Sequence, residues 1–431
     1  MHHYSLRLSI PKRLAPTLGS ETFLWTNDNR GSFDATVGPR LGALGPVPQP
    51  NIELVRLAAA IYAADRTTSR RQGGANWSRR EISLTIPVWN PDRWRAIAAE
   101  LVRLLGLLSG DEWNLNFVRA NTPRGETNAK RPAPVERAVL FSGGADSLCG
   151  ALLSRHELAG APQVLVSHLS WTNLSTIQKT LAGAVERLVP GGPQRHVQIL
   201  FSRRSAQPVS GRRFPNDYTT RTRSLLFISL GLAIASIDGV PLWIPENGFA
   251  SLNPPLGPER RGSLSTRTTH PRLLEDLSAM LAIAEVHANI VNPFASRTKG
   301  EVFRLVGHLL GDDEAAAIIA QSHSCGHTDT RWLGLPATEH CGVCFGCLVR
   351  RAGFRASGLT DATPYLVHRP PDSTLRGFLA SKSAIAAARF FTDRGIRHSD
   401  IASLSLPTSY PVRDAYDLCE RGIAELKLLW Q

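Results

Sequence analysis

The sequence predicts an α/β protein built on a doubly wound parallel sheet, with an α+β N-terminal domain, a metal-binding module and a helical C-terminal tail around it. From residue 137 onward, short apolar runs alternate with segments of helical periodicity, which is the pattern of strand–helix units. A glycine-rich turn lies directly between the first apolar run and the first of these helices. Four of the six cysteines fall between residues 325 and 347, and this crowding indicates a metal site rather than disulfides.

Changes in composition along the 431 residues divide the chain into four expected units. These are an N-terminal α+β accessory domain at 1–130, an α/β ligand-binding domain at 135–322, a zinc-binding module at 323–365 and a helical extension at 366–431. The polar segment 121–134, which contains one Gly and three Pro, is the expected linker between the first two units.

The expected elements follow the alternation of apolar and polar residues. In the first unit we expect strands at 4–10, 81–88 and 113–119, a helix at 91–107 and Gly/Pro-rich loops at 38–50. In the second unit we expect strands at 137–141, 164–169, 195–201 and 241–245, and helices at 148–158, 176–188, 223–237, 271–285, 299–310 and 313–320. The tail from residue 373 is expected to be helical, with a break near 403–411.

The chain carries a net charge of +13, because 49 basic residues outnumber 36 acidic ones. Such a surface favours polyanions, but an arginine-rich proteome explains the charge equally well, so nucleic acid is a less favoured partner. The longest apolar stretch, 225–237, is too short to cross a bilayer and is interrupted by Ser and Gly. The N-terminus has no apolar signal region, so we expect a cytoplasmic protein without a membrane partner.

The turn at 141–147 reads Phe-Ser-Gly-Gly-Ala-Asp-Ser and has the features of an anion site. Its two glycines let the backbone approach an anion, and the following helix offers unpaired N–H groups and its positive dipole end. Its two serines add hydroxyl donors. Asp146 repels a phosphate unless a cation bridges the two, which predicts Mg²⁺. The Walker lysine and the third glycine of the dinucleotide fingerprint are absent, and the alternative is a purely structural tight turn.

Two overlapping Cys-x-x-Cys steps and one upstream cysteine supply four soft ligands: Cys325, Cys341, Cys344 and Cys347. Tetrahedral Zn²⁺ prefers such a set, and four protein ligands make the site structural. The alternatives are an iron–sulfur cluster or buried free thiols. A nearby histidine replacing one cysteine is a less favoured ligand set, and the three candidates are His323, His327 and His340.

The loop Ser-Gly-Gly-Ala-Asp-Ser resembles that of the ATP pyrophosphatases, the PP-loop or adenine-nucleotide alpha-hydrolase-like family. That family cleaves ATP between the α and β phosphates and attaches AMP to a substrate oxygen. A nucleophile then displaces the AMP group together with that oxygen. Segment 340–351 resembles the cysteine cluster of QueC, the 7-cyano-7-deazaguanine synthase branch. Segments 293–301 and 221–224 are similar to the family's lysine and arginine segments. The resemblance spans residues 137 to about 355. In this chain the gap between the first two cysteines of the cluster is longer than is usual for QueC.

The resemblance implies ATP, Mg²⁺ and Zn²⁺ as cofactors and assigns roles to individual residues. The implied catalytic residues are Asp146, Lys299 and Arg223. The implied nucleotide-binding residues are Phe141, Ser142, Gly143, Gly144, Asp146, Ser147, His168 and Arg221.

The chain departs from ordinary QueC in the middle region, where segments 244–256 and 263–271 replace the usual substrate-recognition signature. The turn at Glu246 and Asn247 follows an expected strand end, where open α/β sheets bind ligands. The expected substrate-binding residues are Glu246, Asn247, Arg267 and His270, because carboxylate, amide and guanidinium groups can read a guanine-like edge, a phosphate or a carboxylate. The alternative is a polar loop with Thr269 as a helix cap.

The extra N-terminal and C-terminal regions resemble a longer QueC-like type, the QatC subunit of antiphage operons and the QueC-like partners of CBASS operons. That resemblance implies a ligase that adenylates a 7-deazaguanine carboxylate and transfers it to the N-terminal amine of a partner protein encoded in the same operon. One alternative is small-molecule synthesis of 7-cyano-7-deazaguanine from ammonia. Others are tRNA modification, although Cys149 and Cys419 fall in expected helices, and a nucleotide-sensing subunit without turnover.

Overall fold

The computed structural model describes residues 1–10, 12–26, 28–70, 79–123, 126, 130–169, 172–217, 221–256, 267–326, 333–335 and 339–431. A six-stranded sheet lies at its centre, in the order β10-β9-β6-β7-β8-β3. The strands are β3 Phe33–Ala35, β6 Arg137–Leu140, β7 Gln163–Leu169, β8 Gln194–Arg203, β9 Leu242–Trp243 and β10 Ile290–Val291. Five of them are parallel, and β3 pairs antiparallel with β8 at the edge. The predicted α/β class is confirmed.

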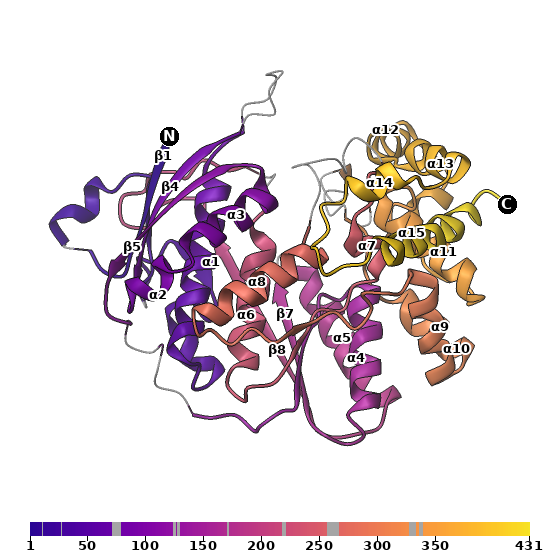
Figure 1. The fold of residues 1–431 in the computed structure, drawn as a ribbon, viewed down its shortest axis with the longest axis horizontal. Coiled ribbons are helices and arrows are strands. Elements are labelled where there is room, and N and C mark those ends of the chain that lie inside the picture. Colours follow the sequence, from indigo (N-terminus) through magenta and orange to yellow (C-terminus); the bar gives the residue numbers. More distant parts are fainter. Residues whose placement is uncertain are drawn as a thin grey trace.

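Helices cover both faces of this sheet (Figure 1). The chain passes from β6 through α4 (Ala145–Glu157), β7 and α5 (Thr172–Leu188) to β8, and then returns through α6 (Arg223–Ala235) to β9 on the other side of β6. Alternate residues of β6 face different cores, since Val139 packs with α4 and α5 whereas Ala138 packs with α6. The strand order therefore reverses at β6, which is the position where open α/β sheets bind ligands.

The N-terminal region forms a second, wholly parallel sheet in the order β2-β1-β4-β5. Its strands are β1 His2–Arg7, β2 Thr22–Leu24, β4 Glu81–Val88 and β5 Glu112–Arg119, and short 3₁₀ helices lie at Lys12–Thr17 and Gly38–Leu44. The predicted helix at 91–107 is instead two helices, α2 Pro91–Arg95 and α3 Ala98–Ser109. Helix α1, Gln49–Thr67, is not predicted by the pattern because it is buried on almost all sides and so has no polar face.

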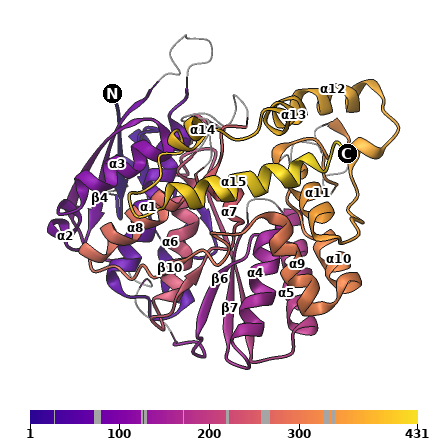
Figure 2. The ribbon, with the colours of Figure 1, turned by 45° about the vertical axis from the view of Figure 1, so that its right-hand side comes forward.

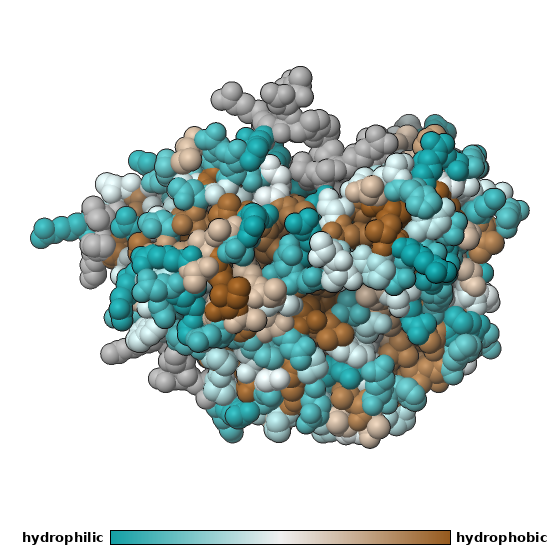
Figure 3. Space-filling view, in the orientation of Figure 1, coloured by the Kyte–Doolittle hydropathy of each residue, from teal (hydrophilic) through white to brown (hydrophobic). Residues whose placement is uncertain are grey.

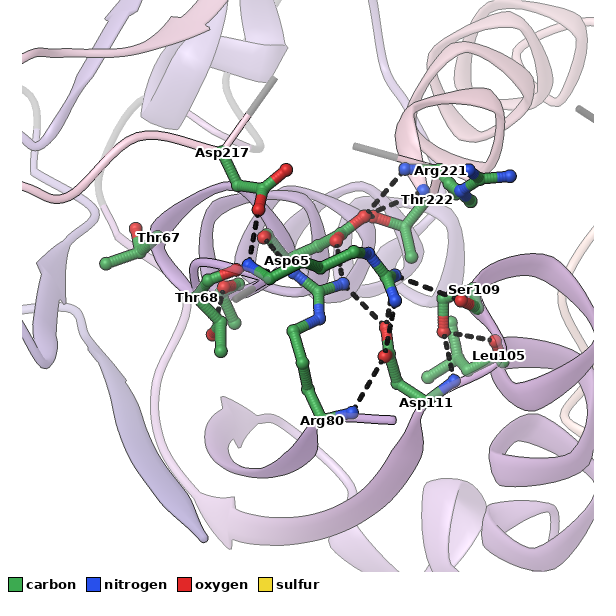
Figure 4. Close-up of polar contacts among 12 residues, drawn as sticks. Asp65, Thr67, Thr68, Arg80, Leu105, Ser109, Asp111, Asp217, Arg221 and Thr222 are labelled. Atoms are coloured by element: carbon green, nitrogen blue, oxygen red, sulfur yellow. Dashed lines mark hydrogen bonds and ion pairs between the residues drawn. The ribbon is translucent and has the colours of Figure 1, made fainter. Parts of the chain in front are cut away.

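A buried ionic network joins α1 to the start of α6 (Figure 4). One carboxylate oxygen of Asp65 accepts the backbone N–H groups of Arg221 and Thr222 at 2.9 and 3.0 Å and the Thr222 hydroxyl at 2.8 Å. Its other oxygen pairs with Arg80, which also binds Asp111 at 2.6 Å. A residue of the N-terminal region therefore anchors the two residues that lead into a helix of the central domain.

From residue 248 onward the described chain is mostly helical, and apart from α8 its helices lie in the right half of Figure 1. Its helices are α7 Gly248–Leu252, α8 Pro271–Ile283, α9 Lys299–Leu310, α10 Asp312–Ala320, α11 Phe345–Ser357, a 3₁₀ turn at Leu366–His368, α12 Ser373–Lys382, α13 Ile385–Arg394, α14 His398–Ala402 and α15 Val412–Lys427. Helix α15 packs against α7, α11, α13 and α14, and Figure 2 shows it running across them. The predicted helical tail is confirmed.

Apolar residues appear in separate patches on the face seen in Figure 3, with hydrophilic residues between them. Among the described helices, none combines the length and the apolar character that a membrane span needs.

Replacing Asp65 by Ala removes the anchor of the residues before α6 and takes one of two carboxylates from the buried Arg80. We expect the free energy of unfolding to fall by about 3–5 kcal/mol, because a buried charge loses one of its partners and buried N–H groups lose their acceptor. Urea titration measures the change. The control is Asp417→Ala, which breaks a 3.8 Å pair between exposed side chains on α15 and should cost less than about 1 kcal/mol. Equal losses in the two variants contradict this role of Asp65.

Candidate functional site

The glycine-rich turn at 141–147 connects the end of β6 to the N-terminus of α4. Gly143 has φ +87°, and a β-carbon there would also come within 3.3 Å of the Gln178 side chain, so the turn requires glycine at this position. Ser142 Oγ accepts the N–H of Gly144 at 3.2 Å and lies 3.1 Å from Ser147 Oγ. The N-terminus of α4 thus lines a cavity, as an anion site needs.

Asp146 lies buried in this turn and joins three helix starts. Its Oδ2 accepts a hydrogen bond from Lys299 Nζ at 2.6 Å and one from the Asn247 side-chain amide at 3.1 Å. Lys299 is the first residue of α9, and Asn247 is the N-cap of α7. Burial raises the pKa of the Asp146 carboxyl, but the Lys299 charge and the hydrogen bonds outweigh burial and bring the pKa below its usual value. The carboxylate is therefore ionised at neutral pH.

The carboxylates at the site fit a Mg²⁺ ion. Asp146 Oδ1 is buried and makes no hydrogen bond to any described residue. The Glu246 side chain lies close to this carboxyl group and contributes to the lowering of its pKa. The backbone of Glu246 is held just after β9 by the Asn292 side chain, which accepts the Glu246 N–H at 3.2 Å and donates to the Glu246 C=O at 2.9 Å. Two converging carboxylates with an unused oxygen are ligands that Mg²⁺ prefers.

A polar cavity of about 350 Å³ opens over this group of side chains. It is lined by the turn, by Glu246, Asn247 and Lys299, and by Thr268, Thr269 and residues 323–325. A second, largely apolar cavity of about 250 Å³ adjoins it and shares Ser142, Ser147, Pro245, Glu246, Thr268 and Thr269 with it. One ligand with an anionic part and a flat ring can occupy both cavities.

His168 and Arg223 lie in the wall of the apolar cavity, with Phe141 beside them. His168 donates its Nε2 proton to the Phe201 carbonyl at 2.9 Å and packs on the Phe227 ring at 4.3 Å between centroids. Burial lowers the pKa of His168 to about 4, so the imidazole is neutral at pH 7. The Arg223 guanidinium lies over the same phenylalanine ring, 5.3 Å from its centre.

Three of the predicted residues are placed away from the turn. The backbone N–H of Arg221 donates to the Asp65 carboxylate, and burial lowers the pKa of the Arg221 guanidinium to about 10. Arg267 and His270 line a third cavity formed with the C-terminal helices, whereas Thr268 and Thr269 between them face the first two cavities. Both expected substrate residues of segment 263–271 therefore lie away from the glycine-rich turn, and only the two threonines between them line its cavities. The first four residues of that segment lie outside the described part of the chain.

Residues just before the first cysteine also reach the turn, which the sequence does not reveal. The Ala145 N–H donates to Ser324 Oγ at 3.1 Å, and the His323 N–H donates to the Gly143 carbonyl at 2.8 Å. These partners lie about 180 residues apart along the chain. The only sequence signal is the position of Ser324 next to Cys325.

The four cysteines form one buried cluster, with their sulfurs all within 4.8 Å of one another. Cys341 Sγ lies 3.7 Å from Cys347 Sγ, and zinc with sulfurs at 2.3 Å in a tetrahedron separates them by about 3.8 Å. The N–H groups of Cys344 and Cys341 point to the sulfurs of Cys341 and Cys325 at 3.3 and 3.5 Å, as they do toward thiolates. The donor set fits structural zinc.

The neighbouring histidines lie outside this set of sulfurs. Burial lowers the pKa of His340, whose Nε2 accepts the Ser324 N–H at 3.0 Å, and His327 lies outside the described residues. The fully buried Arg350 of α11 donates to the hydroxyls of Ser322 and Ser324 at 2.9 and 3.3 Å. The cluster therefore fixes the segment that supports the glycine-rich turn.

Replacing Cys344 by Ser removes one sulfur of the cluster. We expect the purified variant to lose its bound zinc and more than about 3 kcal/mol of stability, because a structural site contributes folding free energy. Elemental analysis and thermal unfolding measure the two effects. Cys419→Ser changes a buried cysteine of α15 outside the cluster and should retain the metal. A Cys344→Ser protein with a full zinc content contradicts the assignment.

Comparison with known proteins supplies an independent observation. No family model matches the chain. The chain is 28% identical over 253 residues to the 7-cyano-7-deazaguanine synthase of Novosphingobium aromaticivorans, an alignment that covers 56% of this chain and 98% of that protein. The synthase of Erythrobacter litoralis is 26% identical over 255 residues, covering 54% and 94%, and that of Cupriavidus taiwanensis is 30% identical over 145 residues, covering 33% and 56%. Over about half of its length, the chain is a distant homologue of the 7-cyano-7-deazaguanine synthases, the QueC enzymes.

Proposed function

We propose that this protein is a QueC-like, ATP-dependent ligase that adenylates a 7-deazaguanine carboxylate and transfers the acyl group to an amine. The acceptor in this proposal is the N-terminus of a partner protein. The observation that carries the adenylation is the group of Asp146, Lys299 and Asn247 at the glycine-rich turn, between a polar and an apolar cavity. Homology to synthases supports an enzyme rather than a binding subunit.

The two cavities suggest how ATP lies in the site. The phosphates fit the polar cavity, where the N–H groups of α4 and the ammonium of Lys299 stabilise negative charge. The adenine fits the apolar cavity beside His168 and Phe227. Asp146 and Glu246 are the residues that would hold Mg²⁺, which supplies charge neutralisation for the departing pyrophosphate when bound.

The reaction in this proposal has two balanced steps. A carboxylate oxygen of the deazaguanine attacks the α-phosphorus of ATP, and the bond to pyrophosphate breaks. The amine nitrogen then attacks the acyl carbon, AMP leaves with the oxygen, and the amine loses a proton. Thr268 and Thr269 line both the polar and the apolar cavity, and they are the proposed contacts to the deazaguanine ring. Lys299 stabilises charge on the phosphates as each bond breaks.

The identity of the acceptor is the most specific part of the proposal. It is supported by the sequence resemblance of the regions outside the QueC-like stretch to the QatC and CBASS-associated proteins of antiphage operons, because that resemblance implies protein modification. The name of the homologues, 7-cyano-7-deazaguanine synthase, favours a second candidate, in which ammonia is the nucleophile and the product is a nitrile.

Thiolation of tRNA is disfavoured by the cysteines outside the cluster. Burial raises the pKa of the Cys149 thiol, and it raises that of Cys419 to about 12. Both are therefore protonated at neutral pH and poor nucleophiles.

Adenylation is tested by exchange of labelled pyrophosphate into ATP in the presence of 7-carboxy-7-deazaguanine. We expect Lys299→Met and Asp146→Asn each to lower the exchange rate by about 100-fold or more, because the phosphates lose charge stabilisation that acts in a water-poor site. Asp313→Asn changes an exposed carboxylate at the start of α10 and should leave the rate unchanged. Undiminished function in Asp146→Ala would favour a nucleotide-sensing subunit over an enzyme.

Transfer is tested by mass spectrometry after incubation with ATP, 7-carboxy-7-deazaguanine and the protein encoded next to this one. We expect the N-terminal peptide of that protein to gain the mass of the acylating nucleobase. If a preparation that is active in pyrophosphate exchange adds no mass to the peptide, transfer to the partner protein is excluded. Nitrile formation with ammonium in the same preparation then establishes the second candidate.

A further inference from the structure

A third cavity, of about 500 Å³, lies between the central domain and the C-terminal helices. The central domain contributes the residues on either side of the undescribed segment 257–266, and α13 and α14 with the turn between them contribute the rest. The lining residues are Leu252, Asn253, Pro255, Arg267, His270, Phe390, Phe391, Arg394, Arg397, Ser399, Asp400, Ser403 and Leu404. The helical extension, whose role the proposed function leaves open, builds half of this cavity.

The charges that line this cavity are mainly positive. Three arginines face one carboxylate, Asp400, which is engaged by Arg394 at 2.8 Å and by the backbone N–H of Arg397 at 2.8 Å. Burial lowers the pKa of the Arg267 guanidinium, and the charge of Arg272 lowers it further. The side chain of Arg267 has a carbonyl as its described partner, Leu107 O at 3.4 Å. An anion in the cavity would relieve this unbalanced positive charge.

His270 adds a buried donor to the same cavity. Its side chain is 1% exposed, and its Nδ1 accepts the Arg272 N–H at 3.2 Å, so the neutral ring carries its proton on Nε2. The Leu404 main chain is close enough to influence the ring, yet Nε2 makes no hydrogen bond of normal geometry with any described residue. A buried N–H without a well-placed acceptor is costly, so an acceptor in the cavity would stabilise this side chain.

One stretch of backbone separates this cavity from the proposed reaction site. Thr268 and Thr269 face the cavities at the glycine-rich turn, while Arg267 and His270 on either side of them face the third cavity. An extended chain covers about 3.3 Å per residue, so three or four residues reach from one cavity to the next.

We propose that this cavity binds an acidic segment of the acceptor polypeptide and so brings its free amino terminus to the adenylated substrate. The carboxylates pair with Arg267 and Arg397, and His270 donates to the segment. Leu252, Phe390 and Phe391 accommodate an adjacent apolar side chain. An inorganic anion uses the basic residues alone, and so the apolar wall favours a peptide over phosphate. This inference rests on the proposed protein transfer, because it names the surface that selects the acceptor.

The test measures binding to the full chain without ATP, by fluorescence anisotropy of two labelled peptides. One peptide carries alternating Leu and Glu residues behind a free amino terminus, and the other has Gln in place of each Glu. We expect the acidic peptide to bind about tenfold more tightly, and we expect Arg397→Glu to abolish this preference. Arg413→Glu makes the same charge change at a side chain that is 90% exposed on α15, and it should preserve the preference.

Equal binding of the two peptides by the wild-type chain overturns the inference, as does an unchanged preference in Arg397→Glu. Binding of inorganic phosphate at this site without any peptide preference overturns it as well. Because the measurement needs no ATP, failure of adenylation removes the proposed function without altering the peptide result. Conversely, active pyrophosphate exchange with no peptide preference removes this inference alone.

Discussion

The buried ion pair between Asp146 and Lys299 is the interaction on which the site depends. It connects the start of α4 to the start of α9, and the Asn247 amide adds the start of α7 to the same carboxylate. Removing both charges from water is costly, so the pair is stable only because each group is also hydrogen-bonded or close to a second partner. The result is a fixed set of helix N-termini around one polar cavity, with one carboxylate oxygen left for a cation.

Two distant parts of the chain hold this arrangement in place. On one side, the cysteine cluster and Arg350 fix Ser324 against the first N–H of α4. On the other side, Asp65 anchors the residues just before α6, whose first residue, Arg223, lies in the wall of the apolar cavity. The N-terminal region is therefore structurally coupled to the site.

Much of the fold could be predicted from local patterns. The strands at 81–88 and 163–169 and the helix at 299–310 follow from the periodicity of apolar residues, and the four cysteines follow from their spacing. Helix α1 could not be predicted, because its polar residues are buried and satisfied by partners far along the chain, as Arg56 is by Glu126. A helix without a polar face gives no amphipathic signal.

The sequence by itself determined the glycine-rich turn, since Gly143 must adopt a positive φ and the residues that shape the turn are neighbours in the chain. It determined the cysteine ligands for the same local reason. Only the tertiary structure decided which side of segment 267–270 each side chain faces. Thr268 and Thr269 line the two cavities at the glycine-rich turn, while Arg267 and His270 line a cavity that α13 and α14 complete more than 100 residues later. Local pattern cannot encode that choice, because it depends on which surfaces distant helices cover.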